Sequence, residues 1–356
     1  MISVIYAVVS ALIALGILIV FHELGHFLVA KKTGVGVLTF SIGFGPKIFG
    51  RKVGETEYLV SAFPLGGYVK MVGEDPDQEV QAVDSERSFS NQGLAKRFAI
   101  VAAGPVFNFI LSILVFTCIF VFFGMPVLTT QIGGVEPNSP AAQAGLQKGD
   151  RILSIGTGPI EKWEDLSMQI KESGGKPLVL RVERDGGQMD ISVQPMEREG
   201  KTIFGEKTTF WVVGIASAVA IQKSNPWMGM WQGVYKTGEY SVLTIVALFK
   251  MVTGDISPKN LGGPLLIAQL AGEQARQGVW NFLFFVAILS VNLGVLNLLP
   301  IPILDGGHLF FFLLEGMRGR PVDLRYRERA QQVGLFVLIL IMIYAFWNDI
   351  ARFLES

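Results

Sequence analysis

The chain has 356 residues, of which half are hydrophobic and only 17% are charged. This composition excludes a disordered chain, and it carries less charge than ordinary soluble proteins, in which about a quarter of residues are charged. Thirty basic residues balance thirty acidic ones, so no positive excess points to nucleic acid. The single cysteine, Cys118, excludes an intramolecular disulfide, a cysteine-based zinc finger and an iron–sulfur centre.

Four segments are long and apolar enough to cross a membrane, which takes roughly 20 residues. The first has no positive residue before its apolar run, so we expect a retained span rather than a signal peptide. The predicted fold class is therefore a polytopic α-helical membrane protein. Its expected spans are 1–31, 98–124, 279–307 and 332–352.

The region 216–278 is predicted to be a helical linker, because apolar residues between Pro226 and Thr253 recur on one helical face. Lys236, Glu239 and Lys250 interrupt this stripe. An amphipathic helix lying in the membrane interface is therefore favoured over a fifth span. The alternative is a helix packed on the soluble insert that precedes it.

Lysines and arginines near the span ends predict the orientation of the chain. They flank the region 32–97 and fill the loop 308–331, so both of these are expected in the cytoplasm. Both termini and the insert between the second and third spans are then extracytoplasmic.

The cytoplasmic region 32–97 is predicted to contain strands at 38–44, 57–63 and 68–72, because apolar and small residues alternate there. Glycine-rich apolar strands beside a span indicate a sheet that dips toward the membrane. A plain cytoplasmic hairpin is the alternative.

Residues 125–215 have the composition of a soluble α+β domain. A short helix begins at Pro140, another helix covers 164–173, and 178–183 pairs with 189–193 as a hairpin. This order resembles a single PDZ domain of the bacterial protease type. Its peptide-binding groove is assigned to Val213, Gly214 and Ile215, where an ordinary core strand is the alternative.

An HExxH motif, formed by His22, Glu23 and His26, ends the first apolar segment. On a helix the two imidazoles share one face and can bind one metal ion, while Glu23 can take a proton from the attacking water. Only one other histidine exists in the chain. Ionisable groups in a spanning helix are costly, which by default indicates function.

A catalytic zinc site takes three protein ligands and keeps one position open. Asp305 is the predicted third ligand, because it ends an apolar run beside Pro302 and two glycines, where the helix must break. As an alternative, Asp305 could cap the following helix, with His308 as the next candidate ligand.

These motifs together resemble the site-2 protease family, in its bacterial RseP/RasP-like branch. The resemblance rests on HELGH in the first span, the PDZ-like insert, and the run from Asn297 to Asp305, which carries NxxPxPxLDG. It implies a membrane-associated β-region at 32–97 and a PDZ domain at 125–215. It also implies Zn²⁺ on His22, His26 and Asp305, with Glu23 as the catalytic base.

The resemblance further implies that Asn297 positions substrate or stabilises the oxyanion. The same comparison of motifs implies substrate binding by Gly43, Gly45, Gly66, Gly67, Tyr68, Asn108, Pro300 and Pro302.

The expected function is that of an intramembrane zinc endopeptidase in the bacterial inner membrane, acting in regulated intramembrane proteolysis and a stress response. Expected partners are single-span proteins such as an anti-sigma factor, trimmed beforehand by a site-1-type protease, and remnant signal peptides. The alternatives are a metal transporter, which would spread ionisable groups along a pathway, and a non-catalytic PDZ scaffold, which would leave Glu23 without a role.

Overall fold

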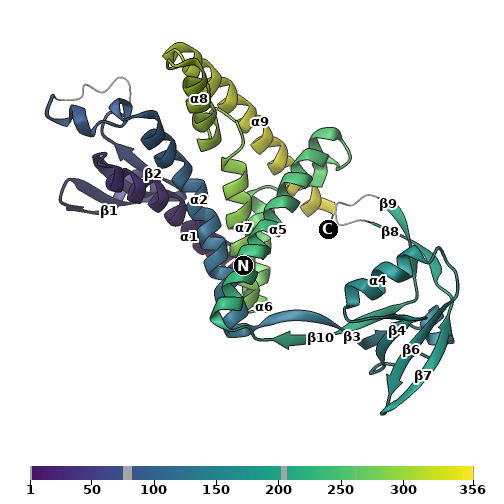
Figure 1. Cartoon of the computed structure of the whole chain (residues 1–356). Coiled ribbons are helices and arrows are strands. Elements are labelled where there is room, and N and C mark those ends of the chain that lie inside the picture. Colours follow the sequence, from purple (N-terminus) through teal and green to yellow (C-terminus); the bar gives the residue numbers. More distant parts are fainter. Residues whose placement is uncertain (1, 75–81, 202–206, 261, 356) are drawn as a thin grey trace. The chain divides into compact units, whose positions relative to one another are not determined.

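The computed structural model describes residues 2–74, 82–201, 207–260 and 262–355. The chain forms two compact units, which we treat separately (Figure 1). A helical unit comprises 1–119, 226–249 and 257–356, and a second unit comprises 120–225 and 250–256.

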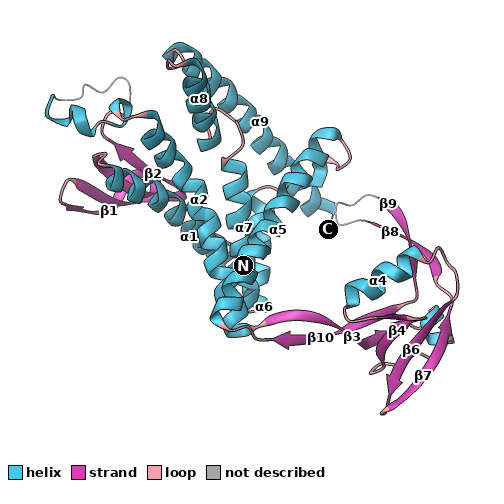
Figure 2. Ribbon diagram, in the orientation of Figure 1, coloured by secondary structure: helices cyan, strands magenta, loops and turns pink. Residues whose placement is uncertain are grey.

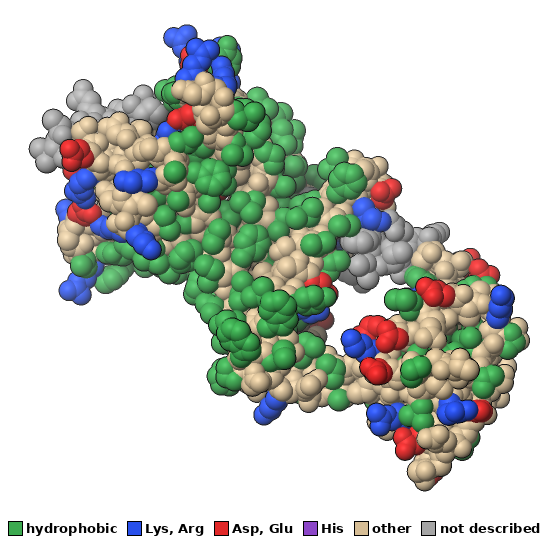
Figure 3. Space-filling view, viewed as in Figure 1, with side chains coloured by type: hydrophobic (Ala, Val, Ile, Leu, Met, Phe, Trp, Pro, Cys, Tyr) green, Lys and Arg blue, Asp and Glu red, His purple; other side chains and the backbone are tan. Residues whose placement is uncertain are grey.

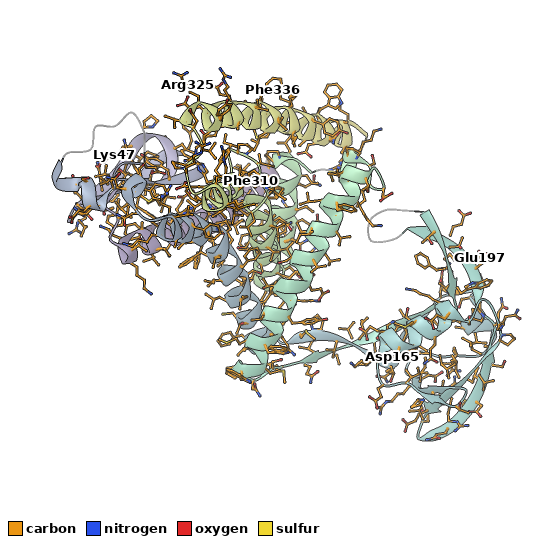
Figure 4. The ribbon with its side chains drawn as sticks, turned by 45° about the horizontal axis from the view of Figure 1, so that its top comes forward. Lys47, Asp165, Glu197, Phe310, Arg325 and Phe336 are labelled. Carbon is orange, nitrogen blue, oxygen red and sulfur yellow. The ribbon has the colours of Figure 1, made fainter. Side chains whose placement is uncertain are left out.

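The helical unit contains long apolar helices. Within the described ranges, four stretches are long and apolar enough to cross a membrane. They lie in α1 (Ile2–Thr33), α2 (Leu94–Cys118), α7 (Val279–Asn297) and α9 (Leu324–Glu355), and α2 continues into a π-helical turn at Ile119–Phe123. Hydrophobic side chains cover much of this unit's visible surface (Figure 3), and Phe336 points outward from α9 with 62% of its surface exposed (Figure 4). The four predicted spans are therefore confirmed in number, and the chain is a multi-pass membrane protein.

The third apolar segment is broken into two helices. Helix α7 ends at Asn297, and α8 (Asp305–Arg318) begins after a turn. Pro300 and Pro302 lie in this turn, where their missing N–H groups and fixed φ oppose a continuous helix. The segment 279–307 is thus the end of one helix and the start of another. The expected loop over 308–331 is helical up to Arg318 and again from Leu324.

Helix α5 (Pro226–Thr253) packs beside α2 and α7 within the helical unit. The hydroxyl oxygens of Ser112 and Thr237 lie 3.2 Å apart, and Thr244 Oγ1 donates to Asn292 Oδ1 at 2.7 Å. A Cβ added at Gly233 would lie 2.8 Å from the carbonyl oxygen of Ile113, so glycine allows the close approach. Helix α5 is not among the candidate spans, and its placement in the interface stays a prediction.

The end of α9 caps the beginning of α6 (Pro264–Gln277). The Asp349 carboxylate, in a residue only 5% exposed, accepts hydrogen bonds from the backbone N–H groups of Gly263, Leu265 and Leu266 at 2.9, 3.0 and 3.1 Å. The first N–H groups of a helix have no partner within it. A side chain more than 80 residues away therefore supplies these partners.

Helix α6 also packs tightly on α1. A Cβ added at Gly272 would lie 2.7 Å from Cα of Ala7. Helix α6 therefore contacts both the first turns of α1 and the end of α9.

The β-region consists of β1 (Val37–Val53) and β2 (Thr56–Met71), followed by 3₁₀ turns at Ala82–Arg87 and Phe89–Asn91. Residues 39–42 of β1 pair both with 57–60 and with 67–70 of β2, so β1 lies between two arms of one long strand. The strands predicted at 57–63 and 68–72 are these two arms. Positive φ angles at Gly43 (91°) and Gly45 (86°) bend β1. In the described part of the chain, 67–70 pairs on one side only and is an edge.

The second unit is built on a sheet with the strand order β10, β3, β4, β6, β7 (Figure 2). These strands are β3 (Met125–Val135), β4 (Arg151–Ile155), β6 (Leu178–Arg184), β7 (Gly187–Val193) and β10 (Ile215–Gln222), with β5 (Gly158–Pro159) beside β4 and a separate hairpin of β8 (Met196–Lys201) and β9 (Lys207–Val212). Helices α3 (Pro140–Gln143) and α4 (Trp163–Glu172) complete it. The predicted helices and the hairpin around 185–187 are confirmed.

An ion pair connects the residue that precedes β4 to the last residue of β6, beside the core of this unit. The guanidinium of Arg184 donates to both oxygens of Asp150 at 2.7 Å, and the backbone N–H of Gln147 donates to the same carboxylate. Because Arg184 stabilises the charged form, the pKa of Asp150 lies below its usual range. Asp150 is therefore a buried charge with its partners satisfied, next to the fully buried Ile152.

Candidate metal centre and active-site cavity

Two helices bring the predicted metal ligands together. His22 and His26 project from one face of α1, and Asp305 is the first residue of α8. Asp305 Oδ2 lies 3.2 Å from His22 Nε2 and 3.6 Å from His26 Nε2, and one ligand atom from each residue falls within 4.8 Å of the others. The structure thus joins residues that are about 280 positions apart in the sequence.

The donor set fits a zinc ion. Oδ2 of Asp305 is buried and has no hydrogen-bond partner among the residues that the structure describes, so a cation would compensate this oxygen. Two imidazole nitrogens and one carboxylate oxygen form a three-ligand set of the type that catalytic zinc sites use. Leu304, not Asp305, is the N-cap residue of α8, and no capping hydrogen bond of a side chain is formed there. The ligand interpretation of Asp305 is favoured over the capping one.

Helix α2 provides a partner for the Nδ1 atom of each histidine. His26 Nδ1–H donates to the carbonyl oxygen of Ile100 at 2.9 Å, which leaves the lone pair of Nε2 for a metal. His22 Nδ1 lies 3.0 Å from the side-chain amide of Asn108. Ligating histidines generally have such a partner on the second ring nitrogen, because it fixes the ring.

Two glycines allow α1 and α2 to approach each other at this point. A Cβ added at Gly104 would lie 2.3 Å from His26 Nε2 and 2.8 Å from His22 Cε1. A Cβ added at Gly25 would lie 2.3 Å from the carbonyl oxygen of Ala103. Carbon atoms normally stay about 3.5 to 4 Å from such neighbours, so neither position accepts a larger residue without displacement. Sequence reasoning missed this role, although Gly25 belongs to the quoted HELGH motif.

Glycines also place Asp305. A Cβ added at Gly306 would lie 2.2 Å from the carbonyl oxygen of Leu299, and one at Gly307 would lie 2.3 Å from that of Ile301. The turn after α7 therefore lies directly on the first turn of α8. This packing fixes the carboxylate opposite the histidines.

A cavity of about 760 Å³ opens at the metal centre. The glutamate of the motif, Glu23, lines it, as do His308 and the edge arm of β2. Gly67 is part of that arm, and a Cβ there would lie 2.9 Å from Cγ of Glu23. Of the predicted site residues, the lining includes His22, Glu23, His26, Gly67, Tyr68 and Asp305.

The other predicted site residues of the helical unit are not among the residues that line this cavity: Gly43, Gly45, Gly66, Asn108, Asn297, Pro300 and Pro302. Gly66 has a packing role, because a Cβ there would lie 1.9 Å from the Phe44 ring. Asn297 is the last residue of α7. The substrate contacts of these residues stay predictions.

An ion-pair cluster lines one part of the cavity and joins three helices. Arg97 of α2 donates to both oxygens of Glu315 on α8, at 2.6 and 3.3 Å, and Arg327 of α9 donates to the same carboxylate at 3.4 Å. The Arg97 and Glu315 side chains are only 13% and 12% exposed. No sequence motif indicated this cluster, since Arg97 and Glu315 are 218 residues apart.

This site joins two histidines of a helix long and apolar enough to span a membrane to a carboxylate at the start of α8, and it is that of a metal-dependent membrane hydrolase. The profile of Peptidase family M50 matches residues 10–341. Zinc metalloprotease RasP of Geobacillus kaustophilus is 31% identical over 99% of this chain and 100% of its own length. Protease RseP of Yersinia pestis and the regulator of sigma-E protease RseP of Salmonella typhimurium show the same identity and coverage.

The chain belongs to peptidase family M50, the site-2 protease family. It is a zinc metalloendopeptidase of the membrane, as predicted from its motifs. This assignment removes the transporter and the non-catalytic scaffold as alternatives.

The substitution Gly104→Ala should displace the His22 and His26 rings and lower the zinc content of the purified protein well below one ion per chain. The measurement is metal analysis of the detergent-solubilised protein after dialysis against a weak chelator. Gly238→Ala, in α5, is the matched control, because a Cβ there meets nothing within 4 Å. Full zinc content in Gly104→Ala would show that the helix crossing tolerates a methyl group and does not set the geometry.

Proposed function

We propose that this peptidase cleaves bonds within the membrane-spanning segments of single-span proteins in the bacterial inner membrane. The observation that carries the proposal is the position of HExxH at residues 22–26, inside the candidate span Val4–Thr33. A peptidase of soluble substrates has no need to bear the cost of ionisable groups in such a helix.

The cavity supports this proposal because it offers an edge strand beside the catalytic base. A peptide bond within a helix is shielded, so the substrate must unwind, and its freed N–H and C=O groups then need partners at membrane depth. The arm 67–70 of β2 pairs with β1 on one side, while Gly67 lies against Glu23. An extended substrate segment can add to the other side of this arm and pass the metal centre.

In this proposal Glu23 takes the proton of the attacking water and later gives it to the leaving amine. Zinc held by His22, His26 and Asp305 would supply the Lewis acidity that polarises a peptide carbonyl and lowers the pKa of water. The proposed oxyanion or positioning role of Asn297 rests on the family motif alone.

The substrates that we propose are single-span proteins of the anti-sigma-factor type, after trimming by a site-1-type protease, together with remnant signal peptides. The name of the Salmonella relative, regulator of sigma-E protease RseP, supports a link to the regulation of a sigma factor. Pre-trimming is consistent with a site that must accept an unwound segment.

We propose further that the second unit is a PDZ domain whose groove takes part in substrate selection. A cavity of about 470 Å³ lies between α4 and the segment that includes Val213, Gly214 and Ile215. Strand β10 is an edge strand of the sheet, and peptide binding by strand addition requires such an edge. Val213 is only 2% exposed and belongs to the hydrophobic core of the unit, so it forms the floor of the cavity and packs against the core.

The orientation that we propose has the termini and the second unit outside the cytoplasm. Basic side chains gather where α8 meets α9 (Figure 3), where the sequence carries Arg318, Arg320 and Arg325. Such residues favour the cytoplasmic side.

The substitution Glu23→Gln should abolish cleavage of a single-span model substrate while leaving the zinc content near one per chain, because the amide cannot accept the proton. The measurement pairs a cleavage assay in detergent or vesicles with metal analysis. Glu328→Gln, on the wall of the same cavity, is the control and should keep most of the activity. Retained cleavage in Glu23→Gln would remove Glu23 from the base role.

Cysteine labelling tests the orientation. In a Cys118→Ser background, a cysteine at Lys148 should react with an impermeant thiol reagent in spheroplasts. A cysteine at Arg325 should react only after lysis. The reverse pattern would contradict the proposed orientation, and labelling of both sites before lysis would indicate leaky membranes.

The groove is tested best on α4, since Gly214 has a φ of +82° and a Cβ there would lie 2.3 Å from that of Ser139. Ser167→Trp should fill the cavity and slow cleavage of a trimmed natural substrate several-fold, with a bare single-span substrate unaffected. Met168→Trp, on the exposed side of α4, is the control. If Ser167→Trp did not slow cleavage of the trimmed substrate more than cleavage of the bare single-span substrate, the groove would be excluded from substrate selection.

A further inference from the structure

We infer that Asn108 is a positioning residue for His22, and that its side-chain oxygen accepts a hydrogen bond from His22 Nδ1–H when Nε2 of that ring binds zinc. The inference rests on the proposed role of His22 as a ligand. It gives Asn108 a function different from the substrate binding that the family motif implies.

The contact itself is close and enclosed. Asn108 is fully buried, and its amide lies 3.0 Å from His22 Nδ1. Its backbone is held in place from the neighbouring helix, because Ser290 Oγ of α7 donates to the Asn108 carbonyl oxygen at 2.7 Å. The amide therefore cannot turn away to solvent, and it faces one ring nitrogen of one ligand.

The chemistry of the imidazole decides which amide atom must face it. A neutral histidine that binds a metal through Nε2 carries its single proton on Nδ1 and needs an acceptor there. An amide nitrogen would place two donors opposite each other at 3.0 Å. The oxygen and nitrogen of an asparagine amide have nearly the same shape, so the hydrogen-bond partner assigns their positions.

A second observation points the same way. With the amide nitrogen toward His22, Oδ1 of Asn108 is buried and has no hydrogen-bond partner among the described residues. Buried acceptors without a partner are rare and costly. The oxygen is therefore free to accept from Nδ1–H once the amide is turned by half a rotation.

Asn108 also completes a pattern on α2. Ile100, Gly104 and Asn108 are spaced four residues apart and lie on one face of the helix. The first gives its carbonyl oxygen to His26 Nδ1–H, the second leaves room for both rings, and the third faces His22. Each histidine thus receives one acceptor from the same helix face, which fixes both Nε2 atoms toward Asp305.

The test is the zinc affinity of the full-length protein in detergent, measured by competition with a chromogenic chelator. Asn108→Ala should weaken zinc binding about 10- to 100-fold, the usual effect of removing such a partner. Asn108→Asp, which as a carboxylate can accept but not donate, should bind within about threefold of the unchanged protein. Ser112→Ala, one turn further along α2 and bonded to Thr237 instead, is the matched control and should not change affinity.

Each result separates the possibilities. Unchanged affinity in Asn108→Ala would overturn the inference, and so would equal losses in the Ala and Asp variants, because the acceptor would then not matter. His22→Ala serves as the reference arm and should lose zinc. If His22→Ala keeps full affinity, the proposed ligand set fails, whereas loss only in His22→Ala refutes the role of Asn108 and leaves the ligand set intact.

Discussion

The crossing of α1 and α2 at Gly25 and Gly104 is the contact on which the site depends. Helices in a membrane gain no hydrophobic driving force from packing on each other, so close approach of backbones and satisfied polar groups must hold them together. Here the absence of two side chains brings α2 near enough to receive the histidine rings. The same approach gives His26 its backbone acceptor at Ile100. A polar site inside an apolar bundle is thus a result of helix packing.

The carboxylate requires a different solution, because a charge in apolar surroundings costs several kcal/mol unless it is compensated. The chain ends α7 at Asn297, turns over two prolines, and restarts as α8 with Asp305 in the first position. The glycines that follow let this turn lie on the new helix. The break in the helix, which would be a defect in an ordinary span, delivers the carboxylate to two imidazoles at 3.2 and 3.6 Å.

Local patterns predicted much of this architecture. The spacing of His22 and His26 follows from helix geometry, and apolar length indicated the four spans. Long-range relations were not accessible in this way. Pro302 and the glycines predicted the break before Asp305, but they did not predict that the turn would lie on the first turn of α8. The pairing of β1 with two arms of β2 depends on the tertiary fold. The contacts of Asn108 with His22 and of Arg97 with Glu315 need α2 to be placed first.

The cap that Asp349 places on α6 has a consequence for biosynthesis. The chain is made from its N-terminus, and α6 packs against α1 near the first residues. The backbone N–H groups of Gly263, Leu265 and Leu266 nevertheless receive their acceptor only from Asp349, more than 80 residues later in the chain. A nascent or prematurely terminated chain therefore exposes an uncapped helix end. The start of α6 is therefore satisfied only once α9 has packed beside it, so this part of the helical unit closes after both helices are in place.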